Sequence, residues 1–345
     1  MVLRHAGGRL IVTVWFLGEN EPLARAELSA AAQRLGGRLL DAPRGESHRA
    51  DVDVPDRATA AALANRLGLA RRCAERWPER GPDAIEARLR RRGVSGDSAA
   101  FQWISGSVGV RPPETLRQLG SVFRSEGGHI SLEHPDIRFW LEPALDVPYT
   151  LYEEVGSVTR HKFSERRTPR LPFQRPVTLE PRYARALVNL GRVGPGDRVV
   201  DPFVGTGSLL LEAALLGADT VGIDASATMI RGVLENFARF DRTPVLLRQA
   251  DAAEAAEEFP TASFDALVTD PPYGRASGTR GERPDRLWAR TLPTWAEKVR
   301  PGGRMALILP QGAPPPAIPG RLELVIPQRV HRSLTREFRV YVREG

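Results

Sequence analysis

The strongest constraint on this chain is a regular alternation of strand-like and helix-like segments that begins near residue 176. The strand-like segments are short and apolar, and they cover residues 198–201, 220–224, 245–248, 266–270, 305–309, 322–327 and 338–343. Helix-like stretches fill the gaps at 208–216, 227–240 and 287–299. This pattern predicts an α/β fold, with a mostly parallel seven-stranded sheet covered by helices on both faces. The last two strands are joined too closely for a crossover, so they are expected to form an antiparallel hairpin.

The first 150 residues show a smaller-scale pattern. A strand-like segment at 10–17 and a helical stretch at 21–35 are followed by a second such pair at 52–54 and 57–67. The region from 71 to 148 has the same character, with segments at 83–92, 101–104, 113–126 and 137–141. Since 345 residues are many for one domain, two small α+β domains are expected before the sheet domain. The expected boundaries are 1–70, 71–150, a linker at 151–175, and 176–345.

The linker is strongly basic. Between residues 159 and 176 the chain has three prolines and one acidic residue, Glu165, and its cations include Arg160, Lys162, Arg166, Arg167 and Arg170. Prolines at this density are typical of a connector, whereas clustered cations also suit a phosphate backbone. The net charge of +7 favours a polyanionic partner in the same way. A plain connector and an RNA-binding segment both remain open.

Composition excludes several other classes. No run reaches the roughly 18 apolar residues of a membrane helix, and no apolar signal segment opens the chain, so we expect a cytoplasmic protein. Cys73 is the only cysteine, which excludes an internal disulfide and a cysteine-rich zinc site. No metal is expected.

A glycine-containing loop joins the first strand of the predicted sheet to its first helix. It reads Asp-Pro-Phe-Val-Gly-Thr-Gly-Ser over residues 201–208, at the carboxyl end of a strand, where open α/β sheets bind ligands. A dinucleotide-binding fingerprint would need a third glycine where the chain has Leu210, and a phosphate-binding Walker loop would need a lysine that is absent nearby. A single tight glycine turn of this kind is typical of loops that bind S-adenosylmethionine.

Carboxylates follow the next two strands at the same edge. Asp224 ends the second strand and can accept hydrogen bonds from both hydroxyls of a ribose. Asp251 ends the third strand and can accept from an adenine amino group. An acid at one strand end is common, but its recurrence after strands one, two and three favours a nucleoside cofactor.

The segment Asp270-Pro271-Pro272-Tyr273-Gly274, after the fourth strand, indicates the reaction. An aromatic amine is a poor nucleophile, because its lone pair is conjugated with the ring. Acceptors that hold its N–H groups favour tetrahedral geometry, and the Asp270 carboxylate and the Pro271 carbonyl can be those acceptors. Tyr273 offers a flat face for a base taken out of its stack, and such stacking contributes about 1–3 kcal/mol. We therefore predict direct methyl transfer to an exocyclic amine, without a covalent enzyme intermediate.

This combination resembles the class I methyltransferases that act on exocyclic amino groups. Within them, it is similar to the archaeal-type tRNA guanine-N2 methyltransferases in the runs 18–20, 23–27, 175–176, 181–190 and 331–336. The resemblance implies a ferredoxin-like domain at 1–70, a THUMP RNA-binding domain at 71–150 and a Rossmann-like methyltransferase domain at 176–345. It also implies N2-methyl- or N2,N2-dimethylguanosine at tRNA position 10 as the product.

The same resemblance assigns residues by position. It implies cofactor contacts from Asp201, Phe203, Gly205, Thr206, Gly207, Asp224, Ala225, Asp251, Ala252 and Asp270. The catalytic residues are expected to be Asp270, Pro271 and Tyr273, and the substrate contacts Pro272, Gly274, His331, Ser333 and Arg336. One departure is Val204, where a cysteine is common in this family; the loop backbone should bind the cofactor with either residue.

Three alternatives stay open at this point. The same chemistry can act on guanine 6 of tRNA, or on an exocyclic amine of rRNA or DNA. A DNA enzyme would need a target-recognition region, whereas the extra domains here are small and precede the catalytic core. A decayed, RNA-binding domain should have lost Asp270, Tyr273, Gly205 or Gly207, and all four are present. We expect a monomer; a small activating subunit, as in eukaryotic relatives, is left open.

Overall fold

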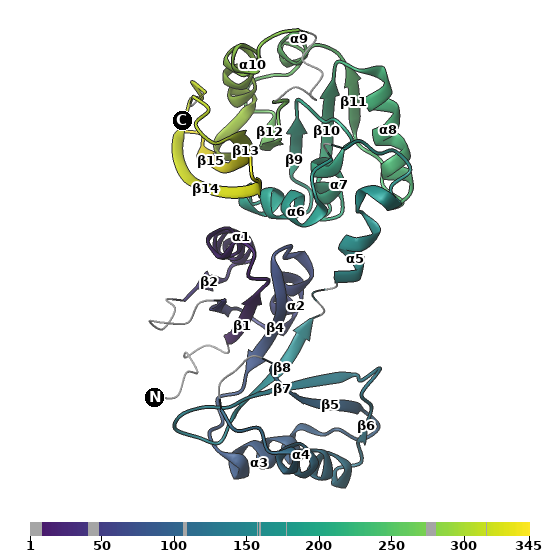
Figure 1. Ribbon diagram of the computed structural model, residues 1–345, viewed down its shortest axis with the longest axis vertical. Helices are drawn as coiled ribbons and strands as arrows, with labels where there is room; N and C mark the ends of the chain where they lie inside the picture. Colours follow the sequence, from purple (N-terminus) through teal and green to yellow (C-terminus); the bar gives the residue numbers. More distant parts are fainter. Residues whose placement is uncertain are drawn as a thin grey trace. The chain divides into compact units, whose positions relative to one another are not determined.

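The computed structural model describes residues 9–40, 48–105, 109–156, 158, 160–176, 178–273, 281–314 and 316–345, without the side chains of 160–162 (Figure 1). The chain divides into two compact units. The first comprises residues 1–16, 35–65 and 70–158, and the second comprises 17–34, 66–69 and 159–345. Among the described helices, none combines the length and the apolar character that a bilayer crossing requires.

One eight-stranded sheet runs through the first unit, in the order β2-β3-β1-β4-β8-β7-β5-β6. In chain order, its strands are β1 (Leu10–Phe16), β2 (Arg38–Leu39), β3 (Arg49–Val54), β4 (Ala70–Arg76), β5 (Ser98–Trp103), β6 (His129–Ile130), β7 (Ile137–Glu142) and β8 (Thr150–Gly156). Antiparallel pairing of β4 with β8, which places Ala74 opposite Glu154, joins its two halves. The two α+β regions expected from the sequence therefore share a single sheet.

The half of this sheet that contains β7 buries one of its faces under helices. The helices of this half are α3 (Pro82–Arg92) and α4 (Pro113–Ser125). The other half has α2 (Arg57–Arg66), which connects β3 to β4. Phe139 and Leu141 of β7 are fully buried in one core with Phe123 of α4. Trp140, between them, faces the other way, and the Arg72 guanidinium carbon lies 3.5 Å from its ring centre. This is the period of two that a pleated strand imposes.

The second unit contains the predicted seven-stranded sheet, in the order β11-β10-β9-β12-β13-β15-β14. Its strands are β9 (Arg198–Asp201), β10 (Asp219–Asp224), β11 (Leu246–Gln249), β12 (Phe264–Thr269), β13 (Val299–Pro310), β14 (Arg321–His331) and β15 (Leu334–Val342). The first five strands pair in parallel, and β15 pairs antiparallel with both β13 and β14. The predicted Rossmann-like sheet with a terminal antiparallel hairpin is confirmed.

Helices lie on both faces of this sheet (Figure 1). Helices α6 (Pro181–Leu190), α7 (Ser208–Ala214), α8 (Ala227–Ala238), α9 (Ala252–Ala256) and α10 (Pro284–Lys298) pack on its strands. The unit also contains α1 (Glu21–Arg34), which packs on α6, and α5 (Arg160–Glu165), with a 3₁₀ turn at Thr168–Arg170. Val221 and Ile223 of β10 share a core with Trp295 of α10. Gly222, between them, faces α7, where an added Cβ would lie 2.9 Å from Leu210. Both faces of the strand are therefore buried, which explains its continuous apolar sequence.

Buried polar groups attach segments 17–34 and 66–69 to the rest of the second unit. The Glu27 carboxylate accepts hydrogen bonds from the backbone N–H groups of Gly68 (2.7 Å) and Leu69 (2.9 Å), and from the Asn189 amide of α6 (2.7 Å). Arg66 donates to Asn189 Oδ1 at 2.9 Å. Burial raises the pKa of Glu27 and lowers that of Arg66 to about 10. Because buried charges need such partners, these contacts tie helix α1 firmly to α6.

Candidate active site

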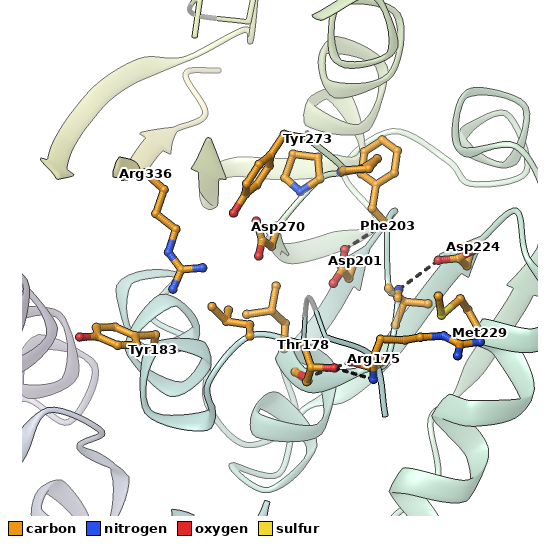
Figure 2. A pocket seen from close by; sticks show the side chains of 18 of the residues that line it. Arg175, Thr178, Tyr183, Asp201, Phe203, Asp224, Met229, Asp270, Tyr273 and Arg336 are labelled. Atoms are coloured by element: carbon orange, nitrogen blue, oxygen red, sulfur yellow. Dashed lines mark hydrogen bonds between the residues drawn. The ribbon is translucent and has the colours of Figure 1, made fainter. Parts of the chain in front are cut away.

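A cavity of about 1160 Å³ opens at the carboxyl edge of the second sheet (Figure 2). Strands β10, β9 and β12 are parallel neighbours, so the residues at or just beyond their carboxyl ends, Asp224, Asp201 and Asp270, come together there. Most of the predicted cofactor residues also line the cavity: Phe203, Gly205, Thr206, Ala225, Asp251 and Ala252. The described substrate candidates on its walls are Pro271, Pro272, Tyr273, His331 and Arg336.

The glycine loop turns sharply between β9 and α7. Gly205 and Gly207 have φ values of 53° and 83°, in the left-handed region that favours glycine. A Cβ at Gly207 would also lie 3.0 Å from Val233 of α8, so this position has little room for a side chain. The loop is held by the Gly207 N–H, which donates to the Val204 carbonyl at 2.8 Å. The backbone here can therefore approach a ligand closely.

The carboxylates of Asp201 and Asp224 stabilise this turn through hydrogen bonds. The Oδ1 atom of Asp201 accepts from the Phe203 N–H (3.0 Å) and from the Thr269 hydroxyl (2.6 Å). Burial raises the pKa of Asp201 to about 7. The Asp224 carboxylate accepts from the N–H groups of Gly205 (3.1 Å) and Ser226 (2.8 Å), so it connects the loop to the end of β10.

The third predicted carboxylate, Asp251, is engaged in a way that the sequence did not indicate. Arg290 of α10 donates to both of its oxygens, at 2.7 and 2.8 Å, and also to Glu282 at 2.9 Å. Asp251 also caps α9 by accepting from the Ala253 N–H at 2.8 Å. The hydrogen bonds from Arg290 lower the pKa of Asp251 to about 2. Arg290 and Glu282 line the cavity as well, but no local pattern marks them as site residues.

Asp270 lies just beyond β12 at the centre of the cavity (Figure 2). Its Oδ1 atom is buried and has no hydrogen-bond partner among the described residues. The Tyr273 hydroxyl points toward Asp270 (Figure 2), and burial together with the charge of that carboxylate raises the pKa of Tyr273 to about 12. Burial raises the pKa of Asp270 to about 6, although the positive charge of Arg336 opposes that shift. The Trp288 indole N–H donates to the Pro272 carbonyl at 3.2 Å and fixes the proline pair.

Arg336 projects from β15 toward Asp270 and Tyr273 (Figure 2). It is almost buried, and its Nε donates to Gln328 Oε1 of β14 at 2.6 Å. His331 also lines the cavity, at its rim, while Ser333 lies exposed in the hairpin turn and hydrogen-bonds with the His331 ring (3.2 Å). Gly274 lies outside the described residues.

The basic linker does not present all of its arginines to solvent. Arg166 is buried, and its Nε donates to Glu212 Oε1 of α7 at 2.5 Å. This pairing removes Arg166 from the set that can reach a phosphate, because Glu212 is already its partner inside the protein. Arg170 is exposed, and Arg167 is an exposed partner of Glu180 (3.2 Å). The side chains of Arg160 and Lys162 lie outside the described residues.

Comparison with known proteins agrees with this site. Residues 168–317 match the family model described as an RMKL-like methyltransferase domain. The tRNA (guanine(10)-N2)-dimethyltransferase of Methanothermobacter thermautotrophicus is 32% identical over 247 residues, which are 70% of this chain and 71% of that protein. The protein of the same name from Pyrococcus abyssi is 34% identical over 233 residues, 66% and 68% of the two chains.

The fold has a solved counterpart over nearly the whole chain. The crystal structure of TrmN from Thermus thermophilus matches with a TM-score of 0.50 and 22% identity, covering 96% of this chain and 99% of that one. At this identity the likeness concerns the fold. The relatedness in sequence to the two archaeal enzymes is closer and extends over two thirds of each protein or more. The chain belongs to the tRNA (guanine(10)-N2)-dimethyltransferase family.

Proposed function

We propose that this protein methylates the exocyclic N2 of guanine 10 in tRNA, with S-adenosylmethionine as the methyl donor. The observation that carries this proposal is the buried Oδ1 atom of Asp270, which has no hydrogen-bond partner within the described part of the chain and lies in a cavity beside the glycine loop. A buried acceptor without a partner is costly unless a ligand supplies the donor. An amine N–H is such a donor.

The residues present fit the cofactor. Gly205, which has a left-handed φ and lines the cavity, leaves room for a nucleoside and its amino-acid tail beside the loop, while Gly207 allows the loop to pack closely on α8. Asp224 offers carboxylate oxygens at the position where ribose hydroxyls are held in doubly wound folds. When bound, the cofactor supplies an electrophilic methyl group on a sulfonium.

Asp270 and the proline pair prepare the nucleophile. The Asp270 carboxylate and the Pro271 carbonyl accept the two N–H groups of the guanine amine and hold its lone pair out of conjugation. The N2 atom forms a bond to the methyl carbon as the carbon–sulfur bond breaks, and the sulfur keeps that electron pair. N2 then loses one proton, and we propose that Asp270 accepts it. The Tyr273 ring stacks on the base, as sequence reasoning also predicts.

The finer organisation of the first unit is part of the same proposal. We assign the N-terminal region expected at 1–70 to a ferredoxin-like domain, which the βαββαβ order of elements and the strand order β2-β3-β1-β4 support; its last strand, β4, extends it to Arg76. The region expected at 71–150 is assigned to a THUMP domain and 176–345 to the methyltransferase domain, and the linker expected at 151–175 begins only after β8, which ends at Gly156. These N-terminal domains are proposed to hold the tRNA while the second unit modifies it.

The experiment that tests the function maps the product. Purified protein is incubated with S-adenosylmethionine and an unmodified tRNA transcript, and the methylated nucleoside is located by nuclease digestion and mass spectrometry. We expect N2-methyl- and N2,N2-dimethylguanosine at position 10, and no product from a transcript with adenine there. Methylation confined to guanine 6, or transfer to no guanine N2 at all, would contradict the proposal.

The exposed linker arginines are expected to contact the tRNA backbone. Replacing Arg167 and Arg170 together with alanine should weaken tRNA binding and reduce the slope of log K against log salt by about one per lost phosphate contact. The matched control is Arg248→Ala, since Arg248 is also exposed, pairs with Glu258 and lies outside the cavity lining. Filter binding over a salt series measures both. An unchanged slope in the double variant would reduce this segment to a connector.

A further inference from the structure

The run Gly18-Glu19-Asn20 precedes helix α1 and is far in sequence from the methyltransferase motifs, yet it reaches the candidate active site. Glu19 and Asn20 line the same cavity as Asp270 and Tyr273. They belong to segment 17–34 of the second unit, so this wall of the cavity is made by a part of the chain that precedes the first helix. Neither residue has a role in the proposed function.

Asn20 fixes this run in place. Its Oδ1 accepts from the Leu23 N–H at 3.1 Å, which caps the start of α1, and its amide donates to the Pro327 carbonyl of β14 at 2.9 Å. Gly18 has a φ of 85°, a left-handed conformation that lets the chain turn just before Glu19. Glu19 is thereby held next to the strand that carries Gln328.

A series of contacts leads from Glu19 to the residues around Asp270. The Tyr183 hydroxyl of α6 donates to Glu19 Oε2 at 3.1 Å, and the Tyr183 ring centre lies 5.8 Å from the Arg336 guanidinium carbon. Gln328 Oε1 accepts from Arg336 at 2.6 Å, and the positive charge of Arg336 acts on the Asp270 carboxylate. Figure 2 shows Tyr183 and Arg336 on the same side of the cavity, with Arg336 between Tyr183 and Asp270.

Glu19 fixes the orientation of Tyr183. A carboxylate only accepts, so the Tyr183 hydroxyl donates to Glu19, and this hydrogen bond holds the phenol ring beside the Arg336 guanidinium. Arg336 has only donors and is buried together with Gln328, its acceptor, so a displaced guanidinium would be costly there. Without an acceptor at Glu19, the Tyr183 ring loses the hydrogen bond that holds it beside Arg336.

We infer that Glu19 is a positioning residue for methyl transfer, which acts through the Tyr183 ring to hold Arg336 beside Asp270. This inference rests on the proposed function, because it assigns Glu19 a part in presenting the Asp270 acceptor to guanine. A purely structural role is a poor explanation, since Glu19 is exposed and Tyr183 is its only hydrogen-bond partner among the described residues.

A double-mutant cycle on kcat tests the inference. Glu19→Ala and Tyr183→Phe should each lower kcat for tRNA by roughly 10-fold, with an unchanged dissociation constant for S-adenosylmethionine. The double variant should be no slower than either single variant, because both changes break the same link. Glu19→Gln keeps an acceptor for the Tyr183 proton and should restore most of the rate. Glu258→Ala is the charge-matched control, an exposed carboxylate away from the cavity, and should keep the full rate.

Several outcomes would overturn the inference while leaving the function intact. Wild-type protein that methylates guanine 10, together with a fully active Glu19→Ala variant, is one of them. Additive losses in the cycle are another, and so is a rise in KM for tRNA at constant kcat, which would make Glu19 an RNA contact instead. A wild-type protein that does not methylate guanine N2 overturns the proposed function itself, so the two failures are distinguishable.

Discussion

Asp270→Ala is expected to lower turnover by about 10²–10⁴-fold, the contribution of a positioned acid–base group. The reason is that no other described carboxylate with a buried, unpartnered oxygen lies in the cavity, so the variant loses the acceptor for the guanine amine. Single-turnover methylation of tRNA measures the effect, and calorimetric titration with S-adenosylmethionine checks that the cofactor still binds. A turnover rate close to that of the wild type in this variant would show that Asp270 has no role in the mechanism.

The pH dependence of the same step provides an independent check. The pKa of Asp270 is raised to about 6, so the carboxylate becomes protonated as the pH falls through 6. A protonated carboxyl is a poorer acceptor, and the wild-type rate should therefore decline on the acid side of about pH 6. Asp270→Asn has no such titration, and its residual rate should be flat over this range. A wild-type rate that stays constant down to pH 5 would show that ionised Asp270 is not required.

Glu212→Ala is expected to destabilise the protein by about 3–5 kcal/mol, the cost of breaking a buried ion pair from one side. Glu212 is 1% exposed and receives hydrogen bonds from two buried guanidinium groups, those of Arg166 (2.5 Å) and Arg185 (2.8 Å). Its removal takes away the negative charge that the two buried guanidinium groups share. Burial already lowers the pKa of Arg185, which indicates how strongly this site disfavours an uncompensated charge.

Urea unfolding monitored by tryptophan fluorescence measures this effect, since Trp288 and Trp295 are buried in the same unit. The matched control is Glu258→Ala, which breaks an exposed pair with Arg248 (2.9 Å) and should cost less than about 1 kcal/mol. Equal losses in the two variants would show that the buried cluster adds nothing beyond a surface pair.

Sequence periodicity predicted the second sheet well but overlooked four strands of the first, the two-residue strands β2 and β6 and the longer strands β4 and β8. Strand β4 reads Ala-Arg-Arg-Cys-Ala-Glu-Arg, and its charged residues hide the apolar alternation that identifies a strand. In the structure, Cys73 and Ala74 are buried, while Arg72 is sheltered by the ring of Trp140. Strand β8 was overlooked as well, and with it the β4–β8 pairing that makes one sheet of two regions. Stacking of this kind depends on distant residues, so local pattern cannot reveal it.

The linker shows the same limit at single residues. Arg166 and Arg167 are adjacent and chemically identical in the sequence, and both were expected to contact RNA. Tertiary packing separates them, because Arg166 faces Glu212 in the interior and Arg167 reaches the exposed Glu180.

The sequence by itself determined which residues gather at the carboxyl edge of the second sheet. Strand–helix alternation is a local property, and once it specifies a parallel sheet, the acids and glycines at the strand ends must meet. Only the tertiary structure decided what those residues touch: Arg290 on Asp251, Arg336 beside Asp270, and Glu19 on Tyr183, whose ring lies beside Arg336. Such pairings join segments up to hundreds of residues apart, and they depend on how whole elements pack, which no local periodicity encodes.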